Sequence, residues 1–254
     1  MTAFTALVLA GTRAEGDPVA VYAGVSHKGL IRLGGTTLLE RVLTALEAAG
    51  AARICVSTND AGIIKALAGL NLGVPVDRIG AAGSPAASVL QAAGGLGTPL
   101  LVTTSDHALL QPDWVIRFIK DAPRDADVAV LLAPEGVVED SAPGTRRTYL
   151  SFRDGKFSGC NLFLLRTPAA LAGVALWRRV ETYRKEPWKI ALMLGPVMLV
   201  GYLLGLLTLN GAIRRLGKLA GVTAAAVLTP YGLAAVDVDK PADLDLVRRL
   251  TGND

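Results

Sequence analysis

The fold is decided by residues 6–35, which begin Ala-Leu-Val-Leu-Ala-Gly-Thr-Arg-Ala-Glu-Gly and end Ser-His-Lys-Gly-Leu-Ile-Arg-Leu-Gly-Gly. The apolar run over residues 4–9 predicts a buried strand that ends near Gly11. A glycine at the end of a strand lets backbone N–H groups approach a phosphate closely. Arg13 and Lys28 follow, and their side chains can neutralise phosphate charge. The segment therefore predicts a nucleoside triphosphate site at the edge of a parallel sheet.

Two common phosphate-binding fingerprints do not match this segment. A Walker A loop requires Gly-Lys-Ser/Thr at a fixed spacing, and the dinucleotide fingerprint requires Gly-x-Gly-x-x-Gly. Neither pattern follows the strand at residues 4–9. If the loop binds phosphate, as its glycine and cations predict, it is of neither of these two kinds.

Length and composition set the broad class. The chain has 254 residues, of which 51% are hydrophobic and 5% aromatic, as expected for aliphatic helices packed on a parallel sheet. Cys55 and Cys160 lie far apart in apolar runs, so we expect neither a disulfide framework nor a zinc site, and a cytoplasmic location. Residues 1–9 lack the basic region of a signal peptide. The net charge of +4 is too small to predict a nucleic-acid partner.

Strand and helix patterns alternate through the first half of the chain, which predicts right-handed βαβ units. The predicted strands are 4–9, 53–58, 74–79, 100–104 and 128–132, and the predicted helices are 37–49, 61–70, 86–95 and 112–120. After these we expect a polar loop (134–147), a hairpin (149–152 with 161–165), a helix (168–184), a last strand (234–238) and a helix (241–250). The fold class is α/β in three Rossmann-like layers with a mostly parallel sheet. We expect one domain over residues 1–254.

The first loop resembles the opening of the nucleotidyltransferases with a MobA-like fold. These include molybdenum cofactor guanylyltransferases, methylerythritol phosphate cytidylyltransferases and sugar-phosphate nucleotidyltransferases. The matching residues are Leu9-Ala10-Gly11 and Lys28. The chain departs from the family where Thr12 replaces a glycine and where Arg13 stands early, ahead of an insert over residues 17–25.

The resemblance implies a role for each residue of this loop. It implies that nucleotide binding involves four consecutive positions, Leu9, Ala10, Gly11 and Thr12. It implies catalytic roles for Lys28 and Arg13, whose charges would face the phosphates. Lys28 is the stronger of these two assignments because its position matches the family pattern better.

Asp106 follows the predicted strand at residues 100–104, in the sequence Ser-Asp-His. Ligands of open α/β sheets bind beyond the carboxyl ends of the strands, which is where this residue would lie. By position alone, Asp106 could equally be a turn residue or a helix cap. The resemblance implies that it ligates a metal ion and takes part in catalysis.

The chain's other candidate ligands lie in Val236-Asp-Val-Asp-Lys-Pro-Ala-Asp-Leu244. Asp237 and Asp239 end the last predicted strand, and the segment resembles the family's closing motif. Asp239 also suits a helix cap before Pro241, and Asp243 suits a favourable charge in the first helical turn. Which of Asp237 and Asp239 ligates stays open.

The resemblance implies an Mg²⁺-dependent transfer of a nucleotidyl group. Mg²⁺ is held by one or two carboxylates together with substrate phosphates. An acceptor phosphate attacks the α-phosphorus and pyrophosphate leaves, so the protein supplies alignment and charge neutralisation. We expect the acceptor to be a phosphorylated small molecule or a lipid-linked phosphate.

A second loop carries the candidate base-recognition residues. Gly83, Ser84 and Ser88 lie between a predicted strand and a predicted helix. They resemble the base-recognition loop of the cytidylyltransferases, which favours CTP, with GTP as the next candidate. The alternative is that Ser84 simply caps the helix.

The acceptor side has three candidates. Asn161 follows a glycine at residue 159, as in the family's Gly-x-Asn, which contacts the acceptor or the ribose. Arg146 and Arg147 could bind an acceptor phosphate. Each of the three could instead be an ordinary strand or loop residue.

Residues 190–209 form an uncharged apolar run of membrane-spanning length. A single span would separate Asp106 from Asp237, so we expect an apolar helical insertion over residues 170–222. Cationic residues flank the run, which favours peripheral contact with an anionic membrane at the inner face. The alternative is a core element or a homodimer interface.

Two other functions remain open from the sequence. A glycosyltransferase of a related fold would use a nucleotide sugar, but it usually carries Asp-x-Asp where this chain has Ser105-Asp106-His107. A non-catalytic membrane-associated scaffold is compatible with the departures at Thr12 and Arg13.

Overall fold

The computed structural model describes residues 3–12, 16–183 and 195–252. These residues form an eight-stranded sheet and a small separate hairpin. The path order of seven strands is β10 (Ala224–Leu228), β7 (Val128–Pro134), β9 (Gly155–Leu165), β6 (Leu100–Thr104), β1 (Phe4–Leu9), β4 (Ala51–Ser57) and β5 (Val76–Ile79), and the eighth, β8 (Leu150–Phe152), pairs with β9. Neighbouring strands are parallel except where β9 runs antiparallel to β6, β7 and β8.

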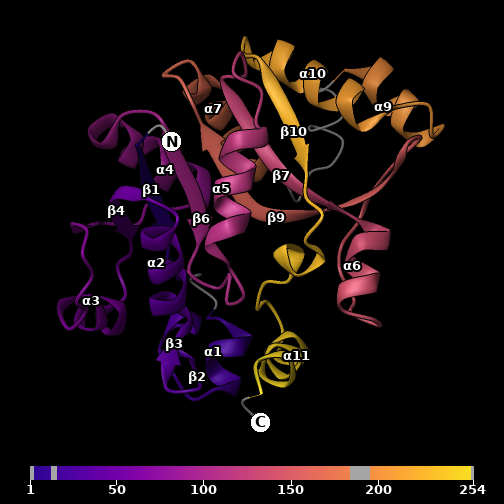
Figure 1. The fold of residues 1–254 in the computed structure, drawn as a ribbon. Coiled ribbons are helices and arrows are strands. Elements are labelled where there is room, and N and C mark those ends of the chain that lie inside the picture. The colour runs from indigo at the N-terminus through magenta and orange to yellow at the C-terminus, as the bar shows by residue number, and fades with distance from the viewer. Residues whose placement is uncertain (1–2, 13–15, 184–194, 253–254) are drawn as a thin grey trace.

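Helices cover both faces of the sheet, as Figure 1 shows. One face packs against α2 (Leu38–Ala48) and α5 (Pro112–Asp121), and the other against α4 (Pro85–Leu96), α7 (Ala170–Thr182) and α10 (Leu209–Ala220). The remaining elements are α1 (Pro18–Tyr22), α3 (Ala61–Ala68), α6 (Glu135–Ser141), α9 (Pro196–Leu203), α11 (Pro241–Thr251), the 3₁₀ helices η1 (Lys28–Leu30) and η2 (Gly232–Ala235), and the hairpin β2 (Arg32–Leu33) and β3 (Thr36–Thr37).

The alternation of strand β1 sorts its side chains between the two layers. Phe4, Ala6 and Val8 pack with α2 and α5, whereas Leu7 packs with α4 and α7. Both sets are buried because successive residues of a strand point to opposite faces. The predicted three-layer, mostly parallel α/β fold is confirmed.

The carboxyl ends of four strands meet at one edge. Leu9 is level with Ser57 of β4 and with Thr104 of β6, and Ser57 is level with Ile79 of β5. The backbone continues the pairing for one residue beyond β1, because the Ala10 N–H donates to the Ser57 carbonyl at 2.9 Å. The segments that follow these strands therefore lie side by side.

The structure corrects the sequence prediction at two places in the second half. The sequence predicts a strand at 234–238, but η2 occupies the first part of this range and β10 takes the place beside β7. The backbone at Gly232 packs against α6 so closely that a Cβ there would lie 2.1 Å from the Val137 carbonyl oxygen. The predicted polar loop at 134–147 contains α6, which supplies this contact.

The apolar run at 190–209 is described from residue 195 onward. There α9 is followed by a turn and by α10. Among the residues that the structure describes, no helix is both long enough and apolar enough to cross a membrane. Three leucines at the end of α9 and after it are exposed, Leu203, Leu204 and Leu206, at 72%, 65% and 61%.

Candidate functional site

A short 3₁₀ helix positions Lys28 at the end of strand β6. His27 caps η1, and its Nδ1 accepts a hydrogen bond from the Gly29 N–H at 2.9 Å. A Cβ at Gly29 would lie 3.3 Å from the Ser105 Cβ, so η1 sits close to the residue before Asp106. This close packing brings the Lys28 side chain to the Asp106 carboxylate.

Lys28 is held by carboxylates from three segments of the chain. Its Nζ forms ion pairs with Asp106, with Asp239 at 2.8 Å and with Asp17 at 3.8 Å. It also donates to the Val238 carbonyl at 3.4 Å. Burial lowers the pKa of this ammonium, but the Asp106 and Asp239 carboxylates raise it more, so the net shift is upward and Lys28 stays charged.

The segment after η2 carries two further carboxylates to Asp106. The Val238 N–H donates to the Asp106 carbonyl at 3.2 Å, which fixes the backbone between Asp237 and Asp239. Asp243, in the first turn of α11, accepts from the N–H groups of Asp239 and Lys240 at 3.1 and 2.9 Å. Asp243 is therefore a support of the site, beyond the first-turn charge that the sequence indicates.

Asp237 is paired with residues from the β9 side of the site. It forms an ion pair with Arg147, and its Oδ2 accepts from Asn161 Nδ2 at 2.7 Å. Asn161 has a φ of 49°, in the left-handed region that asparagine tolerates better than most residues, and it lies where the β7–β9 register shifts. The irregularity turns the amide toward Asp237. Arg147 also contacts Asp243, at 3.4 Å.

The carboxylates are arranged as a divalent cation requires. One oxygen from each of Asp106, Asp237 and Asp239 can be chosen so that all three lie within 4.8 Å of one another. Asp106 Oδ1 is buried and has no hydrogen-bond partner among the described residues. A buried carboxylate oxygen without a partner is costly, and hard oxygen ligands suit Mg²⁺.

The charges around the cluster also fit a cation. Within the described part of the chain, the ion-paired set has five carboxylates and two cationic side chains; its members are Asp17, Asp106, Asp237, Asp239, Asp243, Lys28 and Arg147. The surplus of negative charge would attract a divalent ion. The residues therefore fit Mg²⁺.

The loop after β5 lies beside the loop after β1. A Cβ at Gly11 would be 3.5 Å from the Ala81 Cβ, which is ordinary contact, so packing alone does not require a glycine there. Asn59 fixes the second loop, because its side chain donates to the Ala81 carbonyl at 2.7 Å and accepts from the Ala81 N–H at 3.0 Å. Gly83 has open space around it.

Both serines of the candidate base-recognition loop bind the backbone. Ser84 Oγ accepts from the Ala87 N–H at 3.2 Å and caps α4. Ser88 Oγ accepts from the Ala82 N–H at 2.9 Å and is buried. In this structure the two hydroxyls shape the loop, which supports the capping alternative for Ser84.

The structure brings together six of the predicted site residues. Lys28, Asp106, Asp237, Asp239, Asn161 and Arg147 form one connected group. Of the first loop, Ala10 is buried, Leu9 is half-buried, and Gly11 and Thr12 are exposed. Arg146 is exposed, and Arg13 lies outside the described residues.

Sequence reasoning missed three supporting residues, Asp17, Asn59 and Asp243. A capping pattern could have located Asp17, because it stands directly before Pro18 and its side chain caps α1. Asn59 directly follows a predicted strand, which is a weaker signal. For Asp243 the helix start was visible in the sequence, but its backbone partners were not.

Known proteins resemble this chain both in sequence and in fold. The MobA-like NTP transferase domain matches residues 6–196. A solved structure described as a hypothetical transferase from Thermus thermophilus is 31% identical, covers 96% of this chain and 100% of its own, and has a TM-score of 0.79. No match was found among curated proteins.

More distant structures share the fold. A CMP:2-keto-3-deoxy-manno-octonic acid synthetase complexed with CTP has a TM-score of 0.57 at 17% identity, over 99% of both chains. A 4-diphosphocytidyl-2C-methyl-D-erythritol synthase from Anaerococcus prevotii has a TM-score of 0.59 at 11% identity, over 98% of both chains. At these identities the likeness concerns the fold alone.

We predict that stability falls in mild acid because of His107. Burial lowers the pKa of His107 to about 4, below its ordinary value, although Asp106 opposes the shift. Below the ordinary pKa the unfolded chain binds the proton and the folded chain does not, so stability is lost as the pH falls toward 4. Urea unfolding should show a loss of about 2 kcal/mol from this residue between pH 7 and pH 5. A folded His107→Gln variant should lose about 2 kcal/mol less stability than the unmodified protein over this pH range. Equal losses of stability in the two proteins would contradict the prediction.

We predict that Lys28 and a divalent cation compete for the same carboxylates. In a Mn²⁺ titration followed by electron paramagnetic resonance without nucleotide, Asp106→Asn should weaken binding by about tenfold or more. Lys28→Met should tighten binding by up to about tenfold, because it removes the competing charge. Asp77→Asn changes an exposed ion pair with Arg53 and serves as the control. Weaker binding by Lys28→Met would contradict the prediction.

Proposed function

The chain belongs to the MobA-like NTP transferase family, and we propose that it transfers a nucleotidyl group from CTP or GTP to a phosphorylated acceptor with release of pyrophosphate. The observation that carries the proposal is the meeting of Asp106, Asp237 and Asp239 beside Lys28 at the carboxyl edge of the sheet. Nucleotidyl transfer requires carboxylates that can hold a metal ion, a cationic side chain that can contact the phosphates, and space for a triphosphate. CTP is the first candidate donor, because the loop at Gly83 resembles that of the cytidylyltransferases.

The triphosphate would lie along the loop after β1. Gly11 is exposed and is not required by packing, so a backbone free of side chain there serves close approach of the phosphates. The base would lie along the loop near Gly83, which Asn59, Ser84 and Ser88 hold in place. The two loops are adjacent, so one nucleotide can contact both.

The acidic and the basic residues of the site would have different electrostatic roles. Asp106 with Asp237 or Asp239 would hold Mg²⁺, which supplies neutralisation of phosphate charge when it is bound. In the present structure Lys28 pairs with Asp106 and Asp239. When a triphosphate binds, Lys28 would exchange its carboxylate partners for phosphate oxygens and neutralise charge on the reacting phosphates.

The reaction needs no protein nucleophile. An oxygen of the acceptor phosphate forms a bond to the α-phosphorus, and the bond from that phosphorus to the bridging oxygen of pyrophosphate breaks. Asn161 keeps Asp237 in place and lies next to the position expected for the acceptor or ribose. Arg147 is engaged with Asp237 and Asp243, so the exposed Arg146 is the better placed of the two to receive an acceptor phosphate from solvent.

Direct binding identifies the donor. With CTP, GTP, ATP or UTP at about 100 times its dissociation constant, the native state gains about 2.7 kcal/mol, which is about 5–10 °C in Tm for a chain of this size. We expect one nucleotide, CTP first and GTP next, to give this shift only with Mg²⁺. Gly11→Ala should fold with an unchanged Tm but lose most of the shift, whereas Gly95→Ala, in open space on α4, should keep it.

The other outcomes of this experiment exclude the proposal. A shift with a nucleotide sugar and with no triphosphate would indicate glycosyl transfer. The absence of any nucleotide shift would favour a non-catalytic scaffold.

Where a donor is found, pyrophosphate release with sugar phosphates and polyol phosphates would then identify the acceptor, and Lys28→Met should lower turnover by about 100-fold.

The proposal includes peripheral contact with an anionic membrane. The exposed leucines at 203, 204 and 206 stand next to α10, on which Arg214, Arg215 and Lys218 are exposed. Apolar side chains beside cations suit the interface of an anionic bilayer. Figure 1 places α9 and α10 at the end of the molecule opposite α11, which follows Asp239. This separation favours a water-soluble acceptor over a lipid-linked one.

We predict that the protein floats with vesicles that contain phosphatidylglycerol and much less with phosphatidylcholine vesicles. Leu203→Ser with Leu204→Ser should reduce flotation, because these side chains would enter the interface. Ile64→Ser, at an exposed position on α3, is the control. Full recovery of the unmodified protein in the soluble fraction would contradict membrane contact.

A further inference from the structure

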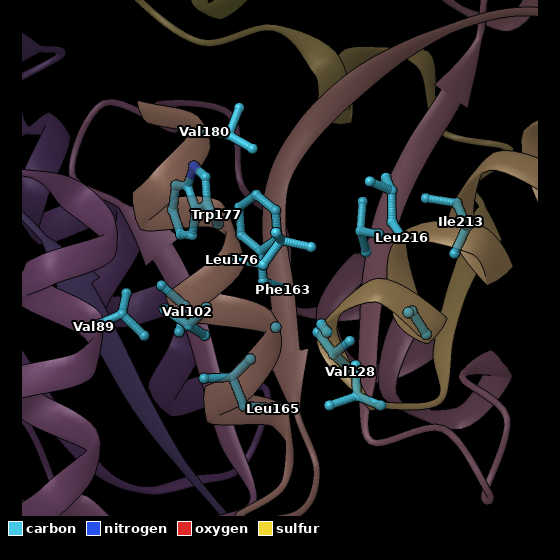
Figure 2. Close-up of a pocket in the computed structure, with 17 residues that line it drawn as sticks. Val89, Val102, Val128, Phe163, Leu165, Leu176, Trp177, Val180, Ile213 and Leu216 are labelled. Atoms are coloured by element: carbon cyan, nitrogen blue, oxygen red, sulfur yellow. The ribbon is translucent and has the colours of Figure 1, made fainter. Parts of the chain in front are cut away.

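An apolar pocket lies between α7, α10 and the sheet. Its volume is about 380 Å³, and all of the described residues that line it are apolar or glycine. Figure 2 shows Trp177 and Val180 from α7 on one side, and Ile213 and Leu216 from α10 on the other. An apolar cavity does not hold water well, and this one is large enough for part of a small-molecule ligand.

Side chains of the sheet form the floor of this pocket. Val102, Val128, Phe163 and Leu165 contribute from three neighbouring strands. Trp177 stacks on Phe163, with ring centroids 5.5 Å apart. The side chains that line the pocket are mostly aromatic or branched and offer almost no polar surface, so they favour a hydrocarbon over a polar ligand.

The two helices that line the pocket turn their apolar sides toward it and carry cationic side chains on their exposed sides. The exposed cations are Arg178 and Arg179 on α7, and Arg214, Arg215 and Lys218 on α10. The exposed leucines at the end of α9 and after it lie shortly before α10 in the chain. The helices that wall the pocket therefore present positive charge to solvent, beside an exposed apolar segment, and this combination suits the head group and the chain of an anionic lipid.

We propose that this pocket binds one acyl chain of an anionic phospholipid, with the head group held by the cations of α7 and α10. The proposal goes beyond nucleotidyl transfer because the pocket and the carboxylate site are separate. The pocket lies on the sheet face that packs against α4 and α7. The chain after Asp106 packs into the layer on the opposite face, through Ala108 and Leu109. The lipid is thus an anchor, and the acceptor binds elsewhere.

Fluorescence of Trp177 gives a direct test with the whole chain. Dibrominated stearic acid quenches tryptophan on contact, so it should quench the unmodified protein in a saturable way and quench Trp177→Phe clearly less. Ala220→Phe should fill the pocket and weaken binding of cis-parinaric acid by at least about tenfold. Ala175→Phe adds the same ring to an exposed position of α7 and should bind normally. Equal binding by the two phenylalanine variants would overturn the proposal.

The head group and the occupant are tested separately. Lysophosphatidylglycerol should displace cis-parinaric acid at a lower concentration than lysophosphatidylcholine does. Arg179→Glu with Arg214→Glu should remove that preference, because each lost cation should weaken binding of the anionic lipid by about fivefold. If Ala220→Phe does not fold, the comparison of quenching between the unmodified protein and Trp177→Phe still tests whether the pocket binds a hydrocarbon chain. A lack of probe binding, or dimers in sedimentation that Ala220→Phe abolishes, would overturn a lipid occupant. None of these readouts depends on nucleotide or turnover, so failure here leaves the proposed transferase activity untouched.

Discussion

The site depends on how the chain neutralises three aspartates that it forces together. Asp106, Asp237 and Asp239 come from two distant parts of the sequence, and their mutual repulsion would separate them without compensation. Lys28 and Arg147 supply that compensation, one on each side of the cluster. The residual negative charge is what makes the cluster receptive to a cation, so stability and function are set by the same balance.

The layered packing explains why so few residues need to be specialised. Four strands end at a common level, which places the loops at Gly11 and Ala81 and the turn at Asp106 on one edge. Local devices then give each loop its shape, such as the His27 cap of η1 and the Asn59 contacts with Ala81. The core fixes the position of each segment, and local hydrogen bonds fix the path of its backbone.

The sequence predicts the first half of this fold well, because runs of Val, Ile and Leu alternate with amphipathic helices. It misses β10, whose sequence Ala-Ala-Ala-Val-Leu has little strand propensity, and places a strand at 234–238, where the contact of Gly232 with α6 decides otherwise. Asp106 could be located because a strand end is visible in the pattern. The partners of Arg147 could not, since irregular loops carry no periodicity.

Strand β9 has a consequence for the order in which the protein assembles on the ribosome. It lies between β6 and β7, although it follows both of them in the chain. Until residues 155–165 have been synthesised, β6 and β7 each present an unpaired edge, which is a hazard for wrong pairing. The half that carries β1, β4, β5 and β6 can form early, whereas β7 is joined to it only once β9 has been made, and Asn161 meets Asp237 only after residue 237 has been synthesised.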